Sequence, residues 1–146
     1  QDDSSRHPKK GEWGDTSPER VLDFMETSGI AREFLNKHVR LVPGFFKDTL
    51  KTWTPRQIAL LHLDVDLYES YQETLTTLFP QVINGGVVMF DEYSDSLWPG
   101  AKIAIDQYFS GMSYHVQEEQ LVGKHYLIKM PLENALLPKV NAQIIA

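Results

Sequence analysis

The chain contains no cysteine among its 146 residues. A disulfide-stabilised scaffold, a thiolate metal site and a cysteine nucleophile are therefore excluded. The absence of cysteine also fits a reducing compartment, and we expect a cytoplasmic protein. No apolar stretch approaches the roughly 20 residues that cross a bilayer. The polar first residues, 1–14, lack the apolar core of a signal peptide, so we expect no membrane partner.

Basic residues are few and dispersed along the chain. Lys and Arg together number 14 against 20 Asp and Glu, which gives a net charge of −6. Binding to nucleic acid requires a concentrated basic surface, so we expect no nucleic-acid partner. The P-loop and the G-x-G-x-x-G pattern of common nucleotide sites are absent. The G-x-S-x-G context of a serine nucleophile is absent as well.

The apolar content of 42% is sufficient for the core of one domain. Residues 1–16 carry few apolar side chains and are predicted to be loop or disordered. Residues 17–146 are predicted to form one α/β domain, which begins with a helix at Ser17-Pro18-Glu19. A short helix over 31–36 and a short strand over Val39–Val42 are predicted to follow.

Residues 58–90 have the pattern of a strand, a helix and a second strand. The apolar runs Ile58–Leu63 and Val87–Phe90 are typical of strands buried on both faces. The intervening helix is predicted to start with a capping box at Ser70 and to end at Pro80. This spacing indicates a right-handed βαβ unit with parallel strands. His62 lies inside the first run, which favours a core histidine over a ligand.

The pattern of residues 99–130 predicts a helix followed by the edge of a sheet. Pro99-Gly100 opens the helix, and its apolar side chains recur at helical spacing. Residues 114–122 and 125–130 then have the pattern of two antiparallel strands around Gly123. The fold class indicated by the whole pattern is α/β, with a parallel core and an antiparallel edge.

Acidic residues follow both predicted strands of the βαβ unit. Asp64 and Asp66 come after the first strand, and Asp91 and Glu92 come after the second. Carboxyl ends of parallel strands meet at one edge of a sheet, where ligands bind in open α/β folds.

The acids allow three interpretations. Neighbouring carboxylates repel unless a cation lies between them, and Mg²⁺ or Ca²⁺ takes such oxygen ligands. Asp64, Asp91 and Glu92 would then be the ligands, with Asp66 in reserve. Alternatively, the acids are solvated and favoured by a helix N-terminus. A paired-carboxylate hydrolase is a third and weaker interpretation, because nothing places two acids in distinct environments.

The stretch LDVDLYESYQETLTTLFPQVINGGVVMFDEYSDSLWPGAKIAIDQYF (63–109) resembles the macrocin-type (TylF-like) O-methyltransferases. The segment VRLVPGFFKDTL (39–50) is similar to the third-strand segment of that family. The resemblance covers roughly residues 17–130. It implies a Rossmann-like class I methyltransferase sheet that uses S-adenosylmethionine and a divalent cation such as Mg²⁺. It also implies a small-molecule acceptor, a hydroxyl group on a natural product or sugar.

The resemblance assigns roles to individual residues. Asp64, Asp91 and Glu92 fall on the metal ligands, and Glu92 stands where the family more often has Asp. Asp64 also falls on the proposed base for the substrate hydroxyl. Phe46, Lys47 and Val65 fall at cofactor-binding positions.

The resemblance further implies a truncated domain. The two strands and the glycine-rich turn that open the family's fold have no counterpart ahead of Val39–Val42. We therefore expect weak binding of S-adenosylmethionine and a homo-oligomer that covers the exposed sheet edge. A non-catalytic dimerisation or binding module and a metal-dependent hydrolase remain the alternative functions.

Overall fold

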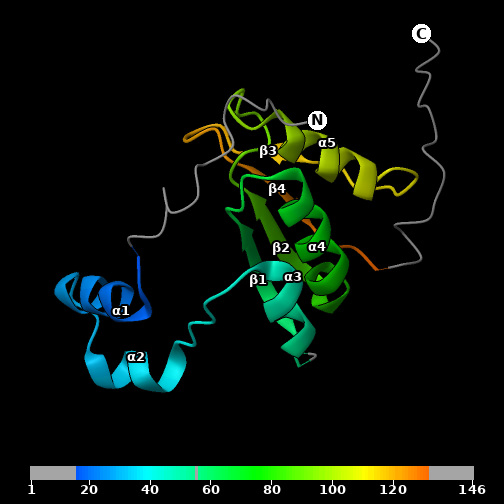
Figure 1. Cartoon of the computed structure of the whole chain (residues 1–146). Coiled ribbons are helices and arrows are strands. Elements are labelled where there is room, and N and C mark those ends of the chain that lie inside the picture. The colour runs from blue at the N-terminus through cyan, green and yellow to red at the C-terminus, as the bar shows by residue number, and fades with distance from the viewer. Residues whose placement is uncertain (1–15, 55, 132–146) are drawn as a thin grey trace, which may run out of the picture. The chain divides into compact units, whose positions relative to one another are not determined.

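The computed structural model describes residues 16–54 and 56–131 (Figure 1). The chain divides into two compact units, to which residues 16–52 and residues 53–131 belong, and each is described by itself. Residues 1–15, most of the predicted N-terminal loop, lie outside the described residues. Over the described residues, no helix is long and apolar enough to cross a membrane.

The first unit consists of helices. Helix α1 (Pro18–Thr27) begins as predicted, with Ser17 as the N-cap and its hydroxyl accepting a hydrogen bond from the Arg20 amide over 3.3 Å. Helix α2 (Arg32–His38) follows. The unit ends with α3 (Phe46–Thr49) and the 3₁₀ turn η2 (Leu50–Thr52).

The predicted strand over Val39–Val42 is wrong. Val39 has extended backbone angles, φ −109° and ψ 128°, but it is the C-cap of α2. The sheet of the described residues contains no strand from this segment. Extended backbone becomes a strand only when a neighbour satisfies its N–H and C=O groups, and Val39–Val42 has no such neighbour among the described residues.

The second unit is built on a mixed sheet of four strands in the order β1-β2-β4-β3. Strand β1 (Ile58–Leu63) pairs parallel with β2 (Val82–Phe90). Strand β4 (His125–Ile128) pairs antiparallel with β2, and β3 (Gln117–Glu118) pairs antiparallel with β4. The predicted parallel core with an antiparallel edge is confirmed.

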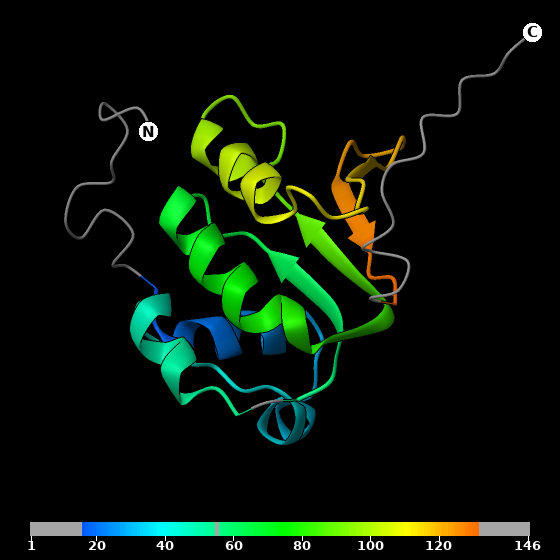
Figure 2. The same cartoon turned by 90° about the vertical axis from the view of Figure 1, so that its right-hand side faces the viewer.

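Two helices of the second unit, α4 (Tyr68–Leu78) and α5 (Pro99–Tyr108), pack on the same face of the sheet (Figure 2). The 3₁₀ turn η3 (Phe79–Gln81) links α4 to β2. Helix α4 begins at Tyr68 without a side-chain cap, so the capping box predicted at Ser70 is wrong. The fully buried core combines side chains from helices and strands, among them Leu75, Val88, Phe90, Ala101, Ala104, Ile105 and Leu127.

Strand β1 is buried on one face only. Leu61 and Leu63 are buried against the helices, whereas Leu60 is 58% exposed and His62 is exposed. The predicted burial on both faces is wrong, because both helices of this unit, α4 and α5, cover the face that carries Leu61 and Leu63 and leave the face of Leu60 and His62 open (Figure 2). His62 is therefore not a core histidine.

Strand β2 runs without a break through the Asn84-Gly85-Gly86 segment. The pairing with β1 shifts register here, between Ile58 and Leu60. Gly86 leaves no room for a side chain, because a Cβ atom would lie 2.9 Å from the Ile83 carbonyl oxygen and 3.1 Å from that of Ala59. The glycine pair thus absorbs an irregularity within one long strand.

Candidate functional site

The ends of β1 and β2 bring the predicted acidic residues together. Leu63 pairs with Phe90 at the last position of both strands, and the Asp91 amide donates to the Leu63 carbonyl over 2.9 Å. Asp64 and Asp91 therefore leave neighbouring strands at the same edge of the sheet. The parallel direction of the two strands produces this proximity, as the βαβ pattern predicts.

Three carboxylates form a compact group at this edge, which we call the acid cluster: Asp64, Asp91 and Glu92. Each offers one oxygen, and these oxygens all lie within 4.8 Å of one another. Asp64 is exposed, Asp91 is half-buried and Glu92 is only 3% exposed. Full ionisation of all three would place like charges close together at a partly desolvated position.

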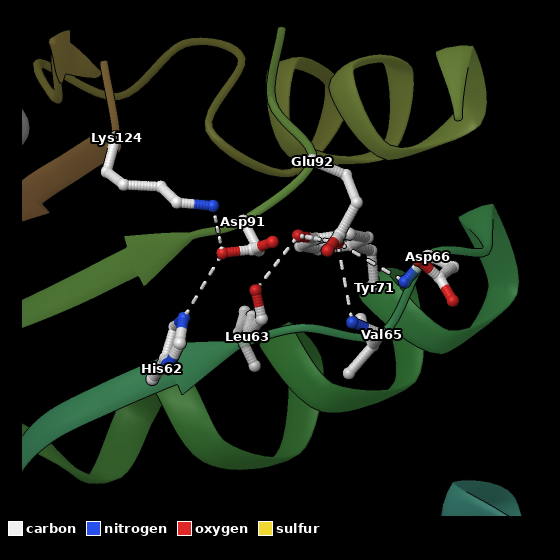
Figure 3. Close-up of polar contacts among 8 residues, drawn as sticks. All are labelled: His62, Leu63, Val65, Asp66, Tyr71, Asp91, Glu92 and Lys124. Carbon is white, nitrogen blue, oxygen red and sulfur yellow. Dashed lines mark hydrogen bonds and ion pairs between the residues drawn. The ribbon is translucent and has the colours of Figure 1, made fainter. Parts of the chain in front are cut away.

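Glu92 is held by hydrogen bonds to its Oε2 atom (Figure 3). The Tyr71 hydroxyl donates over 2.6 Å, the Asp66 amide over 3.2 Å and the Val65 amide over 3.4 Å. Burial raises the pKa of Glu92, and these hydrogen bonds oppose that rise because they favour the carboxylate. Glu92 is thus a buried acid whose pKa is raised overall, although three hydrogen-bond donors face one of its oxygens.

Tyr71 comes from the first turn of α4 and is completely buried. Its hydroxyl also lies 3.1 Å from the Leu63 carbonyl oxygen. Burial and then the hydrogen bond to Glu92 raise the pKa of Tyr71 far above its usual range, so this residue stays a hydrogen-bond donor. The sequence analysis assigned Tyr71 no role. Its position in the first turn of the helix that follows β1 was the available signal.

Asp91 contacts basic side chains on the side away from Glu92 (Figure 3). Its Oδ1 atom accepts a hydrogen bond from the Lys124 ammonium and lies 3.6 Å from Nε2 of His62. The bond from Lys124 is the main cause that lowers the pKa of Asp91, while burial opposes it. In turn the pKa of Lys124 is raised, mainly by its hydrogen bond to Asp91 and further by the charges of Glu92 and Asp64.

Lys124 and His62 are neighbours of the cluster that the sequence analysis missed. His62 was interpreted as a core residue, yet its side chain is 48% exposed and directed towards Asp91. Lys124 directly precedes His125, which pairs with Phe90. The antiparallel register of β4 on β2 therefore places residue 124 beside residue 91, but only once that pairing is known.

Asp66, predicted as a reserve metal ligand, contributes its backbone amide to the site. Its backbone φ of 55° lies in the left-handed region. A hydrogen bond from the Leu67 amide to the Val65 carbonyl, 2.6 Å long, closes a tight turn around it. This turn aims the Val65 and Asp66 amides at Glu92, while the Asp66 carboxylate points away from Glu92 (Figure 3). Burial is the main cause that raises the pKa of Asp66, followed by the charges of Asp64, Asp91 and Asp95.

The acid cluster fits a hard divalent cation. Metal–oxygen bonds of about 2.0–2.6 Å allow one ion to bridge oxygens that are separated by up to about 5 Å. The three carboxylate oxygens meet this requirement. Their negative charge favours such an ion, and the Lys124 ammonium offsets part of it. Asp64, Asp91 and Glu92 are thus close enough to hold one such ion. Their role as metal ligands stays a prediction.

The predicted cofactor residues lie in both units. Phe46 and Lys47 belong to α3 in the first unit. Val65 belongs to the second unit, follows Asp64 directly and donates its amide to Glu92. The role of all three in cofactor binding stays a prediction.

Comparison with known proteins identifies O-methyltransferases among the similar proteins. The model of the macrocin-O-methyltransferase (TylF) family matches residues 8–118. The chain is 46% identical over 76 residues to demethyldecarbamoylnovobiocin O-methyltransferase of Streptomyces niveus, an alignment that covers 52% of this chain and 28% of that enzyme. It is 34% identical over 74 residues to mycinamicin III 3''-O-methyltransferase of Micromonospora griseorubida, which covers 51% of this chain and 28% of that enzyme.

Solved structures of methyltransferases are also similar to this chain. The O-methyltransferase NovP superposes with a TM-score of 0.69 at 33% sequence identity, over 80% of this chain and 46% of that chain. The calicheamicin methyltransferase CalS11 superposes with a TM-score of 0.59 at 27% identity, over 75% of this chain and 44% of that chain. The chain thus spans less than half the length of these relatives. With its family model matched over most of its length, the chain belongs to the macrocin-O-methyltransferase (TylF) family.

Proposed function

We propose that this chain carries the metal-binding half of the active site of an S-adenosylmethionine-dependent O-methyltransferase. The acceptor would be a hydroxyl group on a small natural product or a sugar. The observation that carries this proposal is the acid cluster at the adjoining ends of β1 and β2. The relatives are named as O-methyltransferases of a novobiocin derivative, a rhamnosyl-tetracenomycin and mycinamicin III, and these names support the class of reaction and of acceptor.

The reaction forms one bond and breaks another. The acceptor oxygen bonds to the methyl carbon while the bond from that carbon to the sulfonium sulfur breaks, and the hydroxyl proton must leave. Asp64 is the exposed member of the acid cluster, so its carboxylate can meet an acceptor and take this proton. A bound Mg²⁺ would supply positive charge that lowers the pKa of the hydroxyl.

The other residues of the site would position these groups. Asp91 and Glu92 would hold the cation together with Asp64. Tyr71 and the Val65 and Asp66 amides fix the orientation of Glu92, since all three donate to the same oxygen. Such supporting contacts are usual around metal ligands and typically matter about 10–100-fold in affinity.

We also propose a homo-oligomer. Within the described sheet β1 has a neighbour on one side only, and Leu60 and Ile128 are 58% and 45% exposed on the face away from the helices. A second copy could cover this edge and face. Light scattering on the full chain should give the mass of a dimer or larger, and a monodisperse monomer would reject this part of the proposal.

Calorimetry with Mg²⁺ tests the site directly. The full chain should bind one Mg²⁺, and Asp91→Asn should weaken binding by at least about tenfold, since it removes a charged ligand. Asp106→Asn is the matched control: Asp106 is an ion-paired aspartate of the same unit, bound to Lys102 on α5 and outside the acid cluster. Its affinity should stay within about twofold of the wild type.

Methyl transfer is tested with S-adenosylmethionine and a panel of phenols and sugars. Formation of S-adenosylhomocysteine should require the divalent cation and should be lost in Asp64→Asn. Because S-adenosylmethionine is expected to bind weakly, the assay uses the cofactor at high concentration. Mg²⁺ binding without any transfer under that condition would instead favour the non-catalytic binding module. Absence of Mg²⁺ binding would reject the metal site itself.

A further inference from the structure

Lys124 is directed onto the acid cluster by the backbone of the β3–β4 hairpin. The Lys124 carbonyl accepts from the Glu119 amide over 2.8 Å, and His125 pairs with Phe90 across β4 and β2. These contacts fix the Cα of Lys124 opposite Asp91. The position of its side chain next to the cluster therefore follows from strand register.

The Lys124 ammonium forms an ion pair with a member of the acid cluster. It donates to Oδ1 of Asp91, with 42% of the lysine side chain and 30% of the aspartate side chain exposed. Figure 3 shows the ammonium on one side of Asp91 and Glu92 on the other. Asp91 thus has one oxygen turned towards a fixed positive charge and the other towards the rest of the cluster.

We propose that Lys124 is an internal counter-ion of the acid cluster, which partly neutralises the cluster without metal and competes with a divalent cation for Asp91. This inference rests on the proposed function, because it takes the cluster to be a cation site. A divalent ion among the three carboxylates would lie within several ångströms of the ammonium, where two positive centres repel. Each cation therefore weakens the binding of the other.

Removing the charge of Lys124 should strengthen metal binding. By calorimetry on the full chain at fixed ionic strength, Lys124→Met should bind Mg²⁺ about tenfold more tightly than the wild type, since one nearby repulsive charge is gone. Lys124→Arg keeps the charge and should stay within about threefold of the wild type. Lys102→Met is the matched control, because it removes an equally charged lysine that pairs with Asp106 on α5. It should change the affinity by less than about twofold.

His62 requires its own control because its Nε2 lies 3.6 Å from the same Asp91 oxygen. The Mg²⁺ affinities of proteins with Lys124 and with Lys124→Met are therefore also compared in a His62→Gln background. The tighter binding should persist there, which would assign the effect to the lysine. Loss of the effect in this background would contradict the proposal.

A labelling experiment needs no variant and guards against a variant that fails to fold. Mg²⁺ should release the Lys124 ammonium from Asp91, so its acylation by a water-soluble succinimidyl ester, followed by mass spectrometry, should rise severalfold with Mg²⁺. Lys102 should show no change.

The outcomes separate the two proposals. Equal or weaker Mg²⁺ binding by Lys124→Met, or unchanged labelling of Lys124 in a protein that does bind Mg²⁺, rejects the counter-ion while the metal site stands. Absence of Mg²⁺ binding in the wild type and in every variant rejects the metal site and the counter-ion together.

Discussion

The Tyr71 hydroxyl donates a 2.6 Å hydrogen bond to Oε2 of Glu92 and so ties helix α4 to the end of β2. Tyr71 is 0% exposed and Glu92 is 3% exposed. Water cannot readily replace either partner at such burial, so breaking this hydrogen bond should lower the stability of the folded state. One buried contact thereby serves both the stability of the unit and the position of a candidate metal ligand.

Tyr71→Phe should lower the free energy of unfolding by about 1–3 kcal/mol, because it leaves a buried carboxylate short of a donor. Urea denaturation of the full chain measures this. Tyr68→Phe is the control on the same helix: the Tyr68 hydroxyl donates to Gln107 over 2.7 Å at an exposed position. Tyr68→Phe should lower the free energy of unfolding by no more than about 0.5 kcal/mol. Equal losses for the two variants would contradict a special role for Tyr71.

Glu92 should make stability fall with rising pH in metal-free buffer. Burial raises its pKa above the ordinary 4.5, so the folded chain keeps a proton at pH values where the unfolded chain has released it. Over that interval the folded state binds more protons, and the free energy of unfolding decreases as pH rises. Asp91 acts in the opposite sense at lower pH: its pKa is depressed, so its contribution is lost as pH falls.

Glu92→Gln tests this pH dependence, because the amide keeps the shape of the side chain and cannot ionise. Denaturation midpoints between about pH 4 and about pH 8 should fall less steeply in the variant than in the wild type. Part of the fall should remain, since the pKa of Asp66 is raised as well, mainly by burial. Identical slopes in both proteins would contradict the assignment to Glu92.

Asp66 should tolerate glycine better than valine. Its φ of 55° is a conformation that glycine adopts freely and that a β-branched residue strongly resists. Asp66→Val should lower the free energy of unfolding by about 1–3 kcal/mol. Asp66→Gly should cost less than about 0.5 kcal/mol, because it keeps the amide that donates to Glu92 and also removes a charge close to Asp64 and Asp91. A larger loss for glycine than for valine in thermal unfolding would show that the turn is not what constrains this position.

Gly86→Ala should destabilise the sheet by about 1–3 kcal/mol. The added methyl group would press on the backbone carbonyls of Ile83 in β2 and Ala59 in β1. Both strands are paired, so these carbonyls have little room to move. Gly85→Asn is the control in the same segment: it has open space around it and a φ of +82°, which asparagine tolerates. Chemical denaturation should give a loss for Gly85→Asn clearly smaller than for Gly86→Ala.

Several features of the molecule could be predicted from the sequence because they depend on neighbours in the chain. The apolar runs and the helix between them define the β1–α4–β2 unit, and parallel strands necessarily end at the same edge. Asp64, Asp91 and Glu92 were therefore expected to lie close together. In the structure one carboxylate oxygen of each lies within 4.8 Å of the other two. Ser17 as a helix cap is a local effect of the same kind.

The tertiary structure decided the features that depend on which segments become neighbours. Val39–Val42 has strand-forming residues but no pairing partner among the described residues, and His62 lies in an apolar run whose second face is open. The contact of Lys124 with Asp91 arises from the antiparallel insertion of β4 beside β2. The contact of Tyr71 with Glu92 arises from the packing of α4 on the sheet. Side-chain periodicity reports that a face is apolar, but only packing and pairing determine what covers it.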